Sequence, residues 1–140
     1  MTRREVRDSA FKIIYQSLLR DDTAEELFEA AIESEEIPVD DDVKLMVKDV
    51  LSKAPQLDEM ITKFSKKRTF PRIAKINVAI LRIAFYEILF NDRIPTNAAI
   101  KEAVVLAQNY SQKEDVAFIN GVLGAYSRSS EVSDSENEGN

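Results

Sequence analysis

Three arginines near the start of the chain have a spacing that could bind phosphate. Arg3, Arg4 and Arg7 fall in the first two turns of a predicted helix, where the helix dipole disfavours cations by about 0.3–1 kcal/mol each. On a helical wheel, Arg4 and Arg7 share one stripe with Phe11 and Tyr15. Guanidinium groups neutralise phosphates, and aromatic rings stack on unpaired bases. The stripe therefore indicates either a surface for single-stranded nucleic acid or a solvated arginine face beside two core aromatics.

A denser group of basic residues surrounds a predicted loop in the middle of the chain. Its members are Lys63, Lys66, Lys67, Arg68, Arg72 and Lys75. Basic residues at a loop usually only keep helix ends solvated, so the pattern favours solubility, with nucleic-acid binding as the alternative.

Glu87 is the only acidic residue in the apolar segment 72–91. Either it lies exposed where a helix meets solvent, or its carboxylate pairs with a cation of a partner, because a carboxylate beside so much apolar surface needs one. The sequence leaves both interpretations open.

The residue types that are missing exclude most catalytic chemistry. The chain has no Cys and no His, so the usual zinc sites, disulfides, thiol nucleophiles and imidazole bases are impossible. Its three Gly cannot form a phosphate-binding loop. The acidic run at 40–42 lacks the spacing of a calcium loop. We therefore expect no catalytic residue, no metal site and no cofactor.

The hydrophobic pattern predicts an all-α fold. Apolar residues recur at helical spacing without sustained period-two alternation, and only 4 Pro and 3 Gly interrupt 140 residues. The helix over 72–91 is apolar on most of its circumference and should be central. Thr2 and Glu5 form a capping box for the first helix, and Thr96 or Asn97 should cap the sixth. We expect seven helices. The first two cover about 3–20 and 23–34, the third runs from the acidic run at 40–42 to Pro55, and the fourth runs from Pro55 to about Lys66. The last three cover about 72–91, 96–110 and 113–128.

Charge is distributed unevenly along the chain. Residues 1–19 carry a balance of +2, residues 20–60 −10, residues 61–128 +6 and residues 129–140 −4, which together give the net −6. Polyanion binding by the basic parts is therefore compatible with an acidic protein. Residues 129–140 hold a single aliphatic residue, which predicts a disordered acidic tail. Uncharged stretches are too short to cross a membrane and no apolar signal core follows Met1, so we expect a soluble cytoplasmic protein.

Several segments, taken together, resemble the NusB family of bacterial transcription antitermination factors. No single segment is diagnostic, but their order and spacing match the family over nearly the whole chain except the tail. The segments are Arg3-Arg4-x-x-Arg7-x-x-Ala10 with Tyr15, Leu57-Asp58-Glu59-Met60-Ile61, the run 72–87 that ends in Phe85-Tyr86-Glu87, Ile94-Pro95, Ile100-Lys101-Glu102-Ala103-Val104-x-Leu106-Ala107, and Phe118-Ile119-Asn120-Gly121-Val122-Leu123.

The resemblance implies a single helical domain over 1–128 without catalytic activity, built from two small bundles, 1–68 and 69–128. It also implies two partners: the small-subunit ribosomal protein that serves as NusE, and the single-stranded boxA sequence of nascent RNA. The complex would help RNA polymerase in the elongation complex to read through terminators, notably in ribosomal RNA operons. Free in solution, the protein could be a homodimer.

Site residues follow from the resemblance by matching position. Arg3, Arg4 and Arg7 would contact RNA, while Tyr15 and Glu87 would face the ribosomal partner. This assignment weakens the idea of Tyr15 as a platform for a base. Phe118 and Asn120 would form a second RNA-contacting element, although Phe118 could equally belong to the core.

The chain departs from the family pattern at four positions. The family usually has Trp at the position of Arg68, Asp at Asn77, Asn at Lys101 and often Asp at Gly124. Loss of the Trp removes a large packing contact, which Phe70 could partly replace. Asn77 and Lys101 could have lost a buried polar pairing.

Two other functions compete with the antitermination hypothesis. One is a helical protein-interaction module, possibly homodimeric, without specific RNA binding. The other is the N-terminal helical domain of an RNA cytosine methyltransferase, which the missing cofactor domain and the missing Cys nucleophile disfavour.

Overall fold

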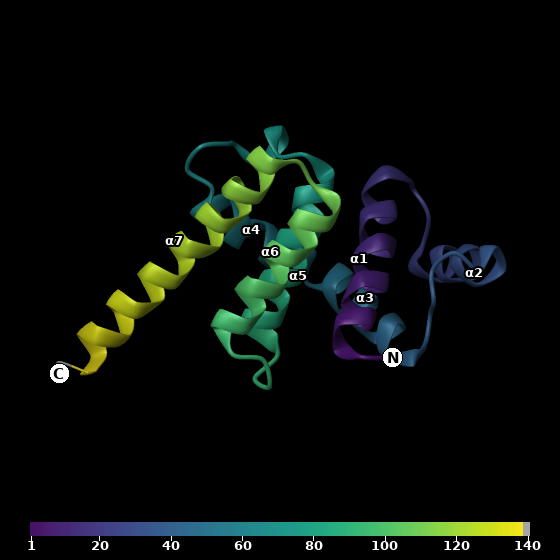
Figure 1. The fold of residues 1–140 in the computed structure, drawn as a ribbon, viewed down its shortest axis with the longest axis horizontal. Coiled ribbons are helices and arrows are strands. Elements are labelled where there is room, and N and C mark those ends of the chain that lie inside the picture. Colours follow the sequence, from purple (N-terminus) through teal and green to yellow (C-terminus); the bar gives the residue numbers. More distant parts are fainter. Residues whose placement is uncertain (139–140) are drawn as a thin grey trace.

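The structure is a computed structural model that describes residues 1–138, with side chains described to residue 130. Its described residues form seven α-helices and one 3-10 turn, without a strand, so the prediction of an all-α fold is confirmed (Figure 1). The elements are α1 (Arg3–Leu19), α2 (Ala24–Ser34), α3 (Asp41–Ser52), α4 (Ala54–Phe64), η1 (Phe70–Arg72), α5 (Lys75–Phe90), α6 (Thr96–Tyr110) and α7 (Lys113–Glu138).

Side-chain caps mark the starts of α1, α2 and α3. The Thr2 hydroxyl accepts the backbone N–H of Glu5 at 3.1 Å, and the Glu5 carboxylate accepts the N–H of Thr2 at 2.9 Å, which confirms the predicted capping box. The prediction of a side-chain cap for α6 is wrong. Pro95 takes the extended conformation before the first turn and Thr96 already lies inside the helix, which has no side-chain cap.

The helices pack in two groups that share one core. α1 packs on α2 and α3, whereas α4, α5, α6 and α7 form the second group, and α1 also packs against α5 (Figure 1). α5 contacts five other α-helices and is buried from Asn77 to Phe85, so it is central as predicted. Because α4 packs on α5 and α7, the two groups divide at the turn between α3 and α4 rather than at residue 68.

The last helix is longer than the sequence predicts. We expect its end at Arg128 and disorder over 129–140, but the backbone of α7 is helical to Glu138. A nucleated helix gains one backbone hydrogen bond for each added residue, and neither Pro nor Gly interrupts residues 125–138. The final turns extend away from the other helices (Figure 1). The remainder of the predicted tail, residues 139 and 140, lies outside the described residues.

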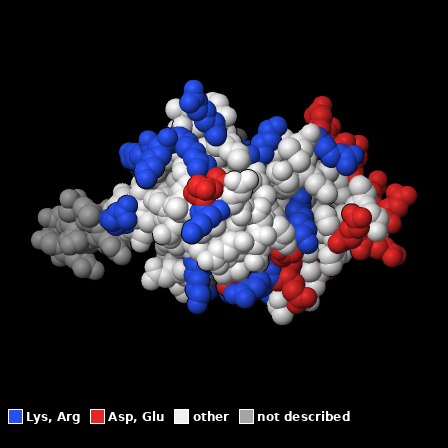
Figure 2. Space-filling model, turned by 45° about the horizontal axis from the view of Figure 1, so that its top comes forward, with Lys and Arg blue, Asp and Glu red and all other residues white. Residues whose placement is uncertain are grey.

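Acidic and basic side chains, which fall in different segments of the sequence, also lie in different parts of the folded molecule. Figure 2 shows acidic side chains gathered at the α2 end of the molecule and basic side chains over the second helix group. Within residues 1–138, no helix has the length and apolar character required to cross a membrane.

Candidate nucleic-acid interface

The exposed part of the basic start is Arg3 and Arg4. Arg3 lies on the surface, and the side chain of Arg4 is 64% exposed. Arg4 binds Glu102 of α6 through two hydrogen bonds, Nε to Oε2 at 3.0 Å and Nη2 to Oε1 at 2.7 Å. The hydrogen bond from Arg4 lowers the pKa of Glu102. The start of α1 therefore offers cations at the surface, one of them held by a carboxylate.

Arg7 is buried, and so is Glu87. Arg7 is 4% exposed and Glu87 2% exposed. Arg7 donates from Nε to Glu87 Oε1 at 2.6 Å and from Nη2 to Oε2 at 2.7 Å, and its Nη1 lies 3.4 Å from Glu102 Oε2. Such a bidentate pair holds both groups in one geometry.

This pair overturns two interpretations from the sequence. Arg7 does not belong to a solvated face, and Glu87 does not lie exposed at a helix end. The cation that the Glu87 carboxylate needs comes from α1 of the same chain, and the pair joins α1 to α5. In this geometry neither group is presented to RNA or to another protein.

The aromatic stripe of α1 divides between core and surface. Phe11 is 2% exposed and its ring centroid lies 5.0 Å from that of Tyr110, which confirms its assignment to the core. Tyr15 is half-buried and stacks parallel to Phe11 with 6.2 Å between ring centroids. Tyr15 therefore remains partly accessible at the surface.

The side chain of Arg68 covers Phe118, which belongs to α7. The Arg68 guanidinium carbon lies 4.2 Å from the centroid of the Phe118 ring, and Arg68 Nη1 donates to Asp115 Oδ1 at 3.0 Å. Phe118 is only 8% exposed beneath it, whereas Asn120 is exposed. No sequence pattern indicates this contact, because Arg68 and Asp115 lie 47 residues apart.

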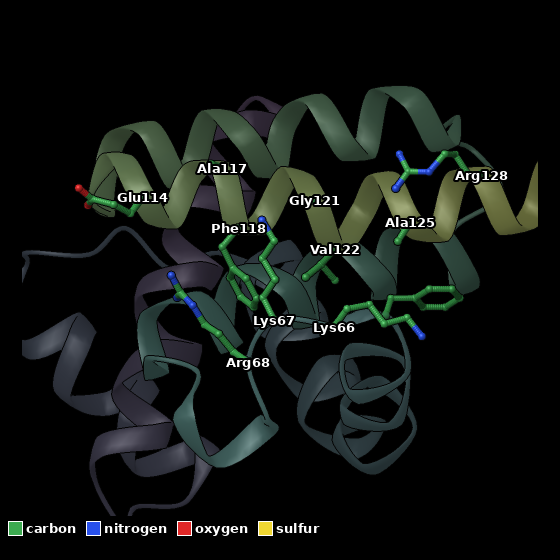
Figure 3. Close-up of a pocket in the computed structure, with 11 residues that line it drawn as sticks. Lys66, Lys67, Arg68, Glu114, Ala117, Phe118, Gly121, Val122, Ala125 and Arg128 are labelled. Carbon is green, nitrogen blue, oxygen red and sulfur yellow. The ribbon is translucent and has the colours of Figure 1, made fainter.

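A cavity of about 520 Å³ lies beside this contact, between the segment 66–68 and α7 (Figure 3). Three members of the predicted basic group line it, namely Lys66, Lys67 and Arg68, and Arg128 of α7 joins them. Phe64 and Val122 provide apolar walls. The other members of the basic group, Lys63, Arg72 and Lys75, do not line the cavity.

Comparison with known proteins identifies the family of this chain. A family model described as the NusB family matches residues 4–128. The chain belongs to the NusB family. It is 42% identical over 126 residues to the transcription antitermination protein NusB of Acetivibrio thermocellus, covering 89% of this chain and 87% of that protein. The NusB of Ruminiclostridium cellulolyticum is 37% identical over 130 residues, with 91% and 90% covered.

Solved structures agree with this assignment. The structure of T. maritima NusB has a TM-score of 0.75 at 26% identity and covers 89% of each chain. The structure of the antitermination factors NusB and NusE in complex with dsRNA also matches with a TM-score of 0.75 at 26% identity, covering 88% of this chain and 93% of that one.

The structure shows the surroundings of three of the four positions that depart from the expected family pattern. At the position of the family's Trp, the guanidinium of Arg68 packs on Phe118, while Phe70 lies half-buried in η1. Asn77 is fully buried, and its Oδ1 accepts the Ser111 hydroxyl at 2.8 Å. Its Nδ2 has no hydrogen-bond partner among the described residues. Lys101 is exposed and does not provide a hydrogen-bond partner for the Asn77 Nδ2 atom.

Proposed function

We propose that this protein is a transcription antitermination factor that pairs with NusE and binds the single-stranded boxA sequence of nascent RNA. In the elongation complex it promotes read-through by RNA polymerase, notably in ribosomal RNA operons. The observation that carries this proposal is the similarity over 88% of the chain to the NusB of a solved complex with NusE and dsRNA. The protein acts in the cytoplasm as an adaptor without catalysis.

Exposure and ion pairing support different roles for the basic residues in this proposal. Arg3 and Arg4 contact phosphates directly, because both are exposed at the start of α1. Arg7 acts indirectly: its pair with Glu87 fixes α1 on α5, and its contact with Glu102 lies beside that of Arg4. Asn120, exposed on α7, is a second contact. Affinity from phosphate neutralisation should fall steeply with salt.

The surface for NusE includes Tyr15. Its ring stacks on the buried Phe11 and the residue remains partly exposed, which suits an interface anchor. Glu87 supports this surface from inside by holding Arg7, rather than by offering its own carboxylate to NusE.

A titration of fluorescent boxA RNA and a scrambled RNA tests the proposal. Each RNA is titrated with the protein alone, with the protein and NusE, and with the Arg3→Ala/Arg4→Ala variant and NusE. We expect sequence-selective binding that requires NusE and is weakened by the double substitution.

A matched control removes the same charge elsewhere. Arg20→Ala/Lys48→Ala takes two exposed cations from the end of α1 and from α3, and it should bind boxA RNA as the wild type does. Equal binding to both RNAs in every mixture would contradict the proposal and favour a helical interaction module without specific RNA binding.

A further inference from the structure

An open groove between α4 and η1 contains none of the residues assigned to RNA or to NusE. Its volume is about 490 Å³, within the roughly 300–1,000 Å³ of pockets that bind ligands. Its apolar surface comes from Pro55 in the first turn of α4 and from Phe70 and Pro71 of η1. The groove therefore has the size of a binding site that the proposed function leaves unused.

The apolar walls of the groove are rigid. The rings of Pro55 and Pro71 fix one backbone torsion each. The turn η1 is closed by two backbone hydrogen bonds, from Arg72 N–H to the Thr69 carbonyl at 2.9 Å and from Ile73 N–H to the Phe70 carbonyl at 3.1 Å. Phe70 is half-buried and packs against the core. A ligand therefore meets a preformed surface, which lowers the ordering cost of binding.

The two carboxylates at the groove differ in availability. Asp58 accepts two hydrogen bonds from Arg82, Nε to Oδ1 and Nη2 to Oδ2, both at 2.8 Å. Glu59 also lines the groove and is exposed. Among the side chains that the structure describes, no cation forms an ion pair with Glu59. Glu59 is therefore the carboxylate that remains available to a cation of a ligand.

Two further polar groups line the groove on the same helix. Lys63 lies one helical turn after Glu59 and is exposed, so its ammonium group has donors for carbonyl oxygens of a ligand. The Thr62 hydroxyl donates to the Asp58 carbonyl at 2.8 Å, which leaves its oxygen as an acceptor. The groove thus presents one acid, one donor and one acceptor beside apolar walls.

This combination fits an extended, proline-rich peptide. A polyproline II segment makes no internal hydrogen bonds, so its carbonyl oxygens are free to accept from a protein. Grooves lined by aromatic rings bind such segments because the peptide is already ordered. The carboxylate of Glu59 calls for a cation beside the prolines. A nucleic acid fits less well, because carboxylates repel phosphates.

We propose that this groove docks a proline-rich segment of a partner protein that carries an arginine beside its prolines. The prolyl rings pack on Pro55, Phe70 and Pro71, Lys63 donates to a peptide carbonyl, and the arginine binds Glu59. Docking is independent of the proposed function, since no residue assigned to RNA or NusE takes part.

A charge reversal on both partners tests the proposal. The probes are a fluorescent oligoproline peptide that ends in arginine and the same peptide ending in glutamate. Each is titrated into the full-length wild type, Glu59→Lys and Glu33→Lys. The last variant is the matched control, because Glu33 is an exposed carboxylate on α2, outside the groove. Backbone amide NMR locates the contact, and thermal unfolding checks that each variant folds.

We expect the arginine peptide to bind the wild type and to shift the amides of 58–63 and 69–70. Glu59→Lys should weaken this binding roughly five- to tenfold, because repulsion replaces attraction at an exposed site. The same variant should bind the glutamate peptide more tightly than the wild type does. Glu33→Lys should bind both peptides as the wild type does.

Three results would overturn the proposal. The first is equal weakening in Glu59→Lys and Glu33→Lys, which would mean that only overall charge matters. The second is a shift of the groove amides by single-stranded RNA and by neither peptide, which would assign the groove to nucleic acid. The third is a shift of the same amides on dilution of the free protein without peptide binding, which would show that a second copy of the chain fills the groove.

Discussion

Two regions of the molecule use their basic residues in different ways. At the start of α1, Arg4 and Arg7 are bound to Glu102 and Glu87, and Arg7 is buried. At the cavity, Lys66 and Lys67 are exposed. The difference shows that carboxylates on distant helices, rather than the basic residue itself, decide whether a cation supports the fold or remains available to a ligand.

The contrast has a simple electrostatic origin. A buried guanidinium loses its hydration, so it is stable only when a carboxylate and several hydrogen bonds replace the lost water. Glu87 supplies them for Arg7. An exposed ammonium keeps its water and needs no partner. Substitution of the buried Arg7 should therefore change stability, and substitution of the exposed Lys66 and Lys67 should change binding.

The largest effect is expected for Arg7→Ala. Loss of one partner of a buried ion pair leaves the other charge uncompensated, so the free energy of unfolding should fall by about 3–5 kcal/mol. Urea unfolding followed by circular dichroism measures the change. Arg7→Met/Glu87→Leu is the control, because an apolar pair should recover most of the loss. A loss below about 1 kcal/mol, the range of exposed pairs, would contradict the structural role of Arg7.

A smaller effect, on binding alone, is expected for Lys66→Ala/Lys67→Ala. Loss of two phosphate contacts should lower RNA affinity roughly tenfold at moderate salt and reduce the salt slope by about 2. Stability should stay within about 0.5 kcal/mol. Filter binding over a range of salt measures the RNA affinity and the salt slope, with Arg20→Ala/Lys48→Ala as the control. An unchanged salt slope would show that Lys66 and Lys67 do not contact the RNA phosphates.

Glu102→Gln should strengthen RNA binding slightly. The substitution removes a carboxylate that competes with phosphate for Arg4, so affinity should rise about two- to five-fold, less than one full phosphate contact contributes. The RNA affinity of Glu102→Gln/Arg4→Ala should not exceed that of Arg4→Ala in the same titration. A rise that persists in the double variant would mean that Arg4 is not the group released.

The smallest effect is a pH dependence of stability. The pKa of Glu102 lies below its ordinary value of 4.5 because Arg4 donates a hydrogen bond to it. A carboxyl group with a lowered folded pKa stabilises the fold above its unfolded pKa, and the contribution is lost as pH falls through the folded value. Unfolding free energy should therefore decrease from about pH 5 downward. Glu102→Gln should show a shallower decrease, and identical acid profiles would contradict the assignment.

Much of the fold was predictable because its determinants are local. The capping box of Thr2 and Glu5 and the apolar periodicity of 72–91 depend on residues within a few positions of one another. The sequence predicts the start of α6 wrongly, because Pro95 and Thr96 compete for the same boundary. The division at residue 68 put α4 with the wrong helix group, since the packing of α4 on α5 and α7 has no local signal.

The sequence by itself determined the helical elements, the family and the kinds of chemistry that are absent, because each depends on residue types and short spacings. Only the tertiary structure decided what the charged residues do. Arg7 and Glu87 lie 80 residues apart, and Arg68, in the segment between α4 and η1, packs on Phe118 of α7. Such contacts arise when helices pack, because burial and proximity set the strength of an ion pair, and neither can be read along the chain.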